Sequence, residues 1–141
     1  MTEEFHKIIK GELCPYCYCE TKLVPGESVF PNKMNTSPRP KYLDKMFYQC
    51  INDSNHYVGT YSNNIKSLGR LADSELRILR NKGHKIFDPL WKEKKVFKSQ
   101  KEAYKWLSVK MDIPLEFTHF GMFTNDQCHK AISFCNEVLS F

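Results

Sequence analysis

Two short motifs constrain the fold of this chain more than any other feature of its sequence. The first is the Cys-Pro-Tyr-Cys sequence at residues 14–17, and the second joins Cys50 to His56 across a short turn. Two thiolates separated by two residues can bind one metal ion, and a second pair of donors from a distant turn completes a tetrahedron. This pattern is typical of zinc ribbons. We predict one structural zinc ion, bound by Cys14, Cys17, Cys50 and His56.

The other cysteines leave alternatives to this assignment. Six cysteines could instead form three disulfides in a secreted protein. However, the first ten residues lack the apolar core of a signal peptide, and no run is long enough to cross a membrane. We therefore expect a cytoplasmic protein that does not associate with membranes. Cys19 is a rival thiolate that we expect to face away from the metal, and its substitution for one of the four ligands is the alternative.

The segments around the two motifs indicate a small sheet. The Pro25-Gly26 pair is a turn signal, and the segment 31–41 has three prolines and no apolar period, which predicts an exposed loop. Aromatic and β-branched residues predict short antiparallel strands at residues 20–24, 28–30, 42–49 and 57–61. The fold class that we predict is α+β, with a zinc ribbon of three to four strands over residues 1–61.

The remainder of the chain, residues 62–141, shows a helical pattern. Apolar residues recur near a period of 3.6 residues, which predicts a helix over about 72–87. Asp88-Pro89 resembles an N-cap followed by proline at the first helical position, so we expect a break and a new short helix there. Ser99–Glu102 and Thr124–Gln127 are capping boxes that begin two further helices.

These patterns predict a compact unit of three to four helices packed against the ribbon. Trp106 shares an apolar stripe with Ala103 and Leu107, and we expect it in the core. Cys128 and Cys135 fall on the apolar stripe of the last helix, and there we expect buried side chains without a chemical role.

The positive charge is concentrated in the middle of the chain. The net charge is +5, and residues 61–105 contain twelve Lys and Arg against five Asp and Glu. Such a concentration can bind a nucleic-acid backbone, although a solvated lysine-rich surface gives the same composition. Aromatic residues near the cysteines can stack on bases, or pack over the zinc or against the helices. The nucleic-acid contacts that we predict are Arg77, Arg80, Lys82, Lys85 and Tyr57.

No motif assigns catalytic residues. His119, Asn125 and His129 are the residue types of a metal-dependent His-Asn-His nuclease, but Asn125 lies inside a capping box and not in the hairpin and helix of such a site. We predict a non-enzymatic module without a small-molecule substrate, with the nuclease as the alternative.

Two resemblances bear on function. Residues 14–60 resemble the zinc ribbons of bacterial type I DNA topoisomerases, because Cys-Pro-x-Cys at 14–17 is followed by aromatic-x-x-Cys at 47–50. In the topoisomerase ribbons the last zinc ligand is normally Cys, whereas in this chain it is His56. Residues 13–135 resemble a bacterial and phage family called zinc-finger-containing domain, through motifs that include Phe-Asp-Pro-Leu-Trp at 87–91 and His-x-Gly-x-Phe at 119–123.

The family resemblance implies zinc and a ribbon followed by helices. The topoisomerase ribbons bind single-stranded DNA, so that resemblance raises the expectation of single-stranded DNA or RNA as the partner. The alternative is a phage or mobile-element protein that binds and modulates a host protein.

Overall fold

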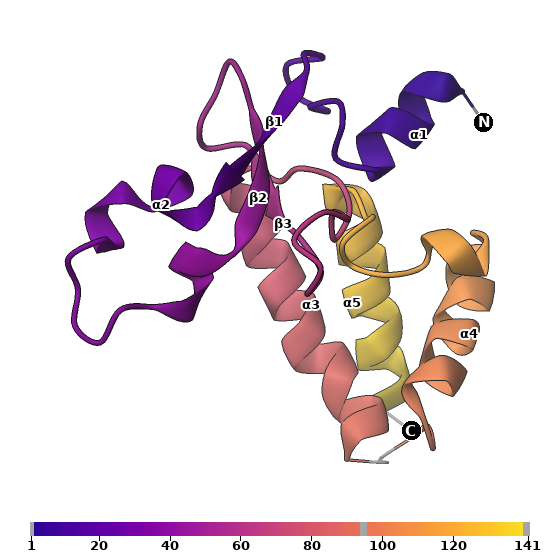
Figure 1. Ribbon diagram of the computed structural model, residues 1–141. Coiled ribbons are helices and arrows are strands. Elements are labelled where there is room, and N and C mark those ends of the chain that lie inside the picture. The colour runs from indigo at the N-terminus through magenta and orange to yellow at the C-terminus, as the bar shows by residue number, and fades with distance from the viewer. Residues whose placement is uncertain (1, 94–95, 140–141) are drawn as a thin grey trace. The chain divides into compact units, whose positions relative to one another are not determined.

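The computed structural model describes residues 2–93 and 96–139 (Figure 1). The chain divides into two compact units, one ending at Ser74 and the other beginning at Glu75. The first contains the sheet and the second contains the long helices, so the predicted α+β class is confirmed. No helix in the described residues is both long and apolar enough to cross a membrane.

The first unit is built on a three-stranded antiparallel sheet in the order β1-β2-β3. Leu23 pairs with Tyr48, and Tyr48 pairs with Val58 on its other side. The sheet agrees with the predicted three to four strands. Its members are β1 (Thr21–Pro25), β2 (Met46–Cys50) and β3 (Tyr57–Gly59).

The two faces of this sheet support different clusters, because successive side chains of a strand point to opposite sides. On one face, the Phe30 ring lies edge-on against Phe47 and Tyr57, with 5.6 Å between the ring centroids in each pair. The other face carries the core that contains the cysteines, formed by Cys14, Cys50, Val58 and Leu71. The metal ligands are therefore part of the hydrophobic core of this unit.

Residues 26–29 form a short helix, α2 (Gly26–Val29), so the strand predicted at 28–30 is wrong. The cause is close packing against the 3-10 helix η2 (Lys41–Asp44). A Cβ on Gly26 would lie 2.2 Å from the carbonyl oxygen of Tyr42, and the Gly26 amide donates to the Lys45 carbonyl over 2.7 Å. This contact between segments distant in sequence outweighs the local strand pattern.

The remaining elements of the first unit are short helices. The first, α1 (Glu3–Ile9), was not predicted from the sequence; its N-cap Thr2 accepts from the Phe5 amide over 3.1 Å. The proline-rich segment 31–41 contains the 3-10 turn η1 (Pro31–Lys33) and ends at the first residue of η2. All its side chains except Pro40 are exposed, as predicted.

The first unit extends beyond residue 61, where the sequence placed its end. Tyr57 and Ala72 exchange two backbone hydrogen bonds of 3.2 and 3.0 Å, and the Leu68 amide donates to the Gly59 carbonyl over 2.9 Å. The segment 62–72 thus returns beside β3 through turns and bends, and forms isolated antiparallel bridges from Ser67 to Thr60 and from Ala72 to Tyr57. Leu71 and Ala72, which fit the apolar period of the predicted helix, are instead fully buried in this unit.

One continuous helix, α3 (Ser74–Lys92), starts at the last residue of the first unit and forms the first element of the second; it contains Pro89. The predicted break at Asp88-Pro89 is therefore wrong. Proline within a helix removes a hydrogen bond at a cost of about 3 kcal/mol. Burial offsets this cost, since one stripe of α3 continues past the proline and is formed by Leu76, Leu79, Gly83, Phe87 and Leu90.

Both predicted capping boxes begin helices. The Ser99 hydroxyl accepts from the Glu102 amide over 3.2 Å at the start of α4 (Gln100–Met111). Thr124 and Gln127 exchange side-chain hydrogen bonds of 2.9 and 3.2 Å at the start of α5 (Asn125–Leu139). Between the two helices lies a 3-10 turn, η3 (Leu115–Phe117). The predicted stripe of α5 is confirmed for its buried members Cys128, Ala131, Ile132 and Cys135.

The core of the second unit is aromatic. Phe120 is fully buried, with its ring centroid 5.8 Å from Phe87 and 5.2 Å from Phe123. A Cβ on Gly83 would lie 2.2 Å from the Phe120 ring, so α3 approaches this ring through the glycine. Trp106, which we expected in the core, is only half-buried and packs against Phe97. That prediction is wrong.

The position of Trp106 follows from the helix geometry of α4. Ala103 and Leu107 lie four residues apart and are both fully buried, so the middle of the buried face of the helix lies along these two residues. Trp106 consequently lies at the edge of that face.

Candidate metal centre

The first pair of cysteines lies on a tight turn. The Cys14 amide donates to the Cys19 carbonyl over 3.0 Å, and the Tyr18 amide donates to the Cys14 carbonyl over 2.9 Å. Tyr18 takes the left-handed conformation, with a φ of 55°, that closes the turn. The turn brings both Cys14 and Cys17 to one side, which is the arrangement that a metal requires.

The second pair lies where β2 ends and β3 begins. The amides of Asn52 and Asp53 donate to the Cys50 sulfur over 3.3 and 3.4 Å. The Cys50 amide donates to the His56 carbonyl over 2.9 Å, and this bond closes the turn between the two residues. Amides that point at a sulfur favour its thiolate form, which is the form that binds metal.

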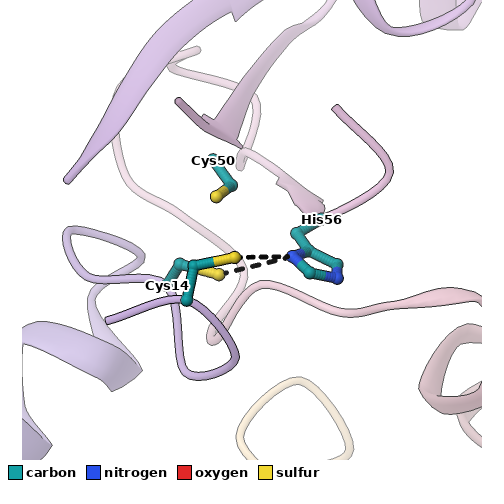
Figure 2. Close-up of side chains that lie close together, drawn as sticks. Cys14, Cys50 and His56 are labelled. Atoms are coloured by element: carbon teal, nitrogen blue, oxygen red, sulfur yellow. Dashed lines mark hydrogen bonds between the residues drawn. The ribbon is translucent and has the colours of Figure 1, made fainter. Parts of the chain in front are cut away.

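These two turns bring the four predicted ligands together (Figure 2). Their donor atoms, three sulfurs and one imidazole nitrogen, all lie within 4.8 Å of one another. Figure 2 shows Cys14, Cys50 and His56 of this group. The sulfurs of Cys14 and Cys17 are each 3.6 Å from Nδ1 of His56. Zinc–sulfur bonds of about 2.3 Å and zinc–nitrogen bonds of about 2.0 Å at tetrahedral angles place sulfur and nitrogen about 3.5 Å apart. The observed spacing therefore fits one tetrahedral zinc ion.

Two side chains outside the ligand set orient the histidine. Oδ2 of Asp53 lies 3.5 Å from Nε2 of His56, on the side of the ring opposite the sulfurs. A carboxylate there favours the tautomer with the proton on Nε2, which leaves the Nδ1 lone pair for the metal. The Tyr16 ring packs on the imidazole at 4.5 Å, and its hydroxyl accepts from the Asp73 amide over 3.2 Å. Asp53 was not among the residues predicted for the site, although its position three residues before His56 in the second motif could have indicated it.

The electrostatics of the thiols set the conditions for metal binding. Desolvation by burial, and then the nearby Cys50 thiol, raise the pKa of Cys17. Burial acts in the same direction on Cys50, but the Cys19 thiol and the amides of Asn52 and Asp53 outweigh it and lower the pKa of Cys50. Zinc binding to this site must therefore displace protons from sulfur, and zinc affinity is expected to fall as the pH falls.

Cys19 lies outside the four ligands, but it does not face away from them as we expected. Its sulfur lies 3.3 Å from the Cys50 sulfur. The reason is the pairing of the backbone on either side, because the Ile51 amide donates to the Glu20 carbonyl over 3.4 Å and aligns the two segments.

The predicted nucleic-acid contacts are placed in both units. On α3, Lys82 and Lys85 are exposed, whereas Arg77 and Arg80 are half-buried. Arg80 donates from Nε to the Phe120 carbonyl over 3.0 Å and from Nη2 to the Gly121 carbonyl over 2.8 Å. Its guanidinium thus holds the loop before α5. In the first unit, Tyr57 belongs to the aromatic cluster on the sheet.

The described residues contain no second cluster of this kind. Among the His, Cys, Asp and Glu side chains of residues 2–93 and 96–139, three or more gather only at the four ligands. His119 and His129, considered for a nuclease site, are in no such group.

A site closed by three thiolates and one imidazole has no open position for water or substrate, so it stabilises a fold. Together with the sheet, it defines a zinc-binding domain of the ribbon type with one structural zinc ion. The chain belongs to the family described as zinc-finger-containing domain, whose model matches residues 10–138. Neither a curated protein nor a solved structure matches the chain.

Replacing His56 tests the ligand set. His56→Ala is expected to weaken zinc binding by more than about 100-fold, since loss of a residue that only supports a ligand already costs 10–100-fold. His56→Cys is expected to keep tight binding, because zinc accepts either donor. Competition with a chromogenic chelator measures both, with Cys128→Ser as the control. Wild-type affinity in His56→Ala would mean that Cys19 or another group is the fourth ligand.

Proposed function

We propose that this zinc-stabilised domain binds nucleic acid, preferentially single-stranded, through the outer face of α3. The observation that carries the proposal is a row of exposed side chains on that helix. Ile78, Lys82 and Lys85 follow one another at spacings of four and three residues and are all exposed. Such spacing places them on one face, opposite the buried stripe.

The charge of this face favours a polyanion. No ion pair to Lys82 or Lys85 forms within the described part of the chain, so both ammonium groups are available to phosphates. Arg77 lies beside this row, at the half-buried edge of the face. Arg80 contributes less, because its guanidinium already binds two carbonyl groups. We therefore propose three phosphate contacts, from Arg77, Lys82 and Lys85.

Stacking of bases is proposed for the exposed aromatic residues of the first unit. Tyr18 and Tyr61 expose 63% and 44% of their surface, whereas Tyr57 keeps its ring against Phe30 and Phe47. An exposed ring can stack on an unpaired base of any identity, which favours single strands over duplexes. We therefore propose Tyr18 and Tyr61, in place of Tyr57, as the residues that stack on bases.

Salt dependence tests the proposal. Each phosphate contact with a single strand contributes about −0.7 to the slope of log affinity against log salt, so three contacts give a slope near −2. The double variant Lys82→Ala and Lys85→Ala is expected to flatten this slope by about 1.4. Tyr18→Ala is expected to cost about 1–3 kcal/mol with little change in slope, because stacking is not ionic.

Titration of labelled single- and double-stranded oligonucleotides with zinc-loaded protein at several salt concentrations gives these slopes. Lys130→Ala removes an exposed lysine from α5 and serves as the matched control. If neither strand form binds at low salt, the proposal is wrong and the host-protein alternative replaces it.

A further inference from the structure

We propose that Cys19 and Cys50 form an oxidation site, at which a peroxide converts the two thiols to a disulfide and withdraws Cys50 from the zinc ligands. The proposal goes beyond nucleic-acid binding and rests on the zinc site alone. It assigns a role to Cys19, the one cysteine of the first unit that does not belong to the ligand set.

The two sulfurs are already in contact. They lie 3.3 Å apart, and a disulfide bond of about 2.05 Å requires them to approach by roughly another 1.2 Å. The backbone on both sides holds them there. Thr21, two residues after Cys19, pairs with Cys50 in the sheet, and the Ile51 amide bonds to the Glu20 carbonyl. The backbone pairing therefore keeps the two sulfurs close to the distance at which a disulfide forms.

Accessibility makes Cys19 the first sulfur to react. Cys19 is half-buried, so an oxidant in solvent can reach it, whereas Cys14 and Cys50 expose 0% and 2% of their surface. Cys17 is also half-buried, but its sulfur belongs to the ligand set, whereas the Cys19 sulfur does not. Only Cys19 combines access to solvent with a sulfur outside the ligand set and a second thiol in contact.

The proposed chemistry balances with hydrogen peroxide as the oxidant. The Cys19 sulfur attacks one peroxide oxygen, the O–O bond breaks, and Cys19 becomes a sulfenic acid while one water is released. The Cys50 sulfur then attacks the Cys19 sulfur, the S–S bond forms and the S–O bond breaks. Because Cys50 is a thiolate when it binds zinc, the hydroxide that leaves takes a proton from solvent and becomes a second water. In total, the Cys19 thiol and the Cys50 thiolate form the disulfide, one proton is taken from solvent, and the peroxide is reduced to two waters.

The consequence is the loss of one of four ligands. Cys50 is also part of the core on the sheet face, with Cys14, Val58 and Leu71, so its withdrawal affects metal binding and packing together. A thiol reductant reverses the disulfide, and added zinc then restores the site. The first unit thus becomes sensitive to peroxide through one pair of sulfurs.

The experiment treats the full zinc-loaded chain with hydrogen peroxide and follows zinc release with a chromogenic chelator. Peptide mass spectrometry under non-reducing conditions then identifies the linked cysteines. We expect a Cys19–Cys50 peptide that is lighter by two hydrogens, formed in step with the release of one zinc. Cys19→Ser is expected to release zinc about tenfold more slowly, because it lacks the accessible sulfur. Cys128→Ser, on α5, is the matched control and is expected to behave as wild type.

Three outcomes would overturn the proposal. One is a disulfide between Cys14 and Cys17 with Cys19 still reduced. Another is zinc release from Cys19→Ser at the wild-type rate. The third is failure of Cys19→Ser to bind zinc at all, which would make Cys19 a ligand. The absorption spectrum of the cobalt-substituted variant shows beforehand whether its metal site is intact.

Discussion

Removal of zinc is expected to unfold the first unit and to leave the second unit folded. The sheet of the first unit has only three short strands, and two of the ligands, Cys14 and Cys50, are members of the core on one of its faces. Structural zinc contributes roughly 10–16 kcal/mol of apparent binding free energy at neutral pH, which equals or exceeds the stability of a whole domain. The second unit has its own core around Phe87 and Phe120, which contains no ligand.

Amide hydrogen exchange before and after chelation distinguishes the two units. Protection is expected to disappear for residues 12–72 and to persist in α3, α4 and α5. Elemental analysis of natively purified protein should first give one zinc per chain. A metal-free native sample, or full protection of β1–β3 after chelation, would contradict the prediction.

Phe120→Ala is expected to destabilise the second unit by about 3–5 kcal/mol, as is usual for truncation of a buried aromatic residue. Phe120 is fully buried, and its ring packs against Phe87 and Phe123. It also lies close against α3 at Gly83, where there is no side chain. Trp106→Ala is expected to cost clearly less, because that side chain is half-buried at the edge of α4.

Urea unfolding followed by the circular dichroism of the helices measures both variants, and zinc content serves as the control for the first unit. Equal losses in Phe120→Ala and Trp106→Ala would show that the core does not centre on Phe120. No loss in Phe120→Ala would contradict the packing described for this unit.

The zinc ligands were predictable because their chemistry is local in the sequence. Residues 14–17 form one tight turn and residues 50–56 another, so each pair is positioned by its own backbone. Thiolate and imidazole donors at these spacings fit few purposes other than metal binding. Only the approach of the two turns required the sheet, in which β2 ends at one pair and β1 follows the other.

The starts of α4 and α5 were predictable for a similar reason. A capping box satisfies backbone amides within four consecutive residues, so Ser99 and Thr124 act whatever surrounds them. The stripe of α5 also follows from sequence, because its buried members recur with the period of the helix.

Other features depend on contacts between segments far apart in the sequence, and only the tertiary structure decided them. The sequence around Pro89 predicts a break, but burial of Phe87 and Leu90 on one stripe keeps α3 continuous. The charge of Arg80 predicts a surface contact, but the carbonyls of Phe120 and Gly121 take its donors.

Cys19 shows the same limit at the metal centre. Its neighbours in the sequence do not indicate where its sulfur points, and the pairing of residues 20 and 51 brings it to Cys50. The sequence alone thus determined the turns, the caps and the metal donors, because hydrogen bonds and ligand geometry within a few residues specify them. Packing between segments far apart along the chain decided the rest, because its free energy exceeds the local preferences that it overrides.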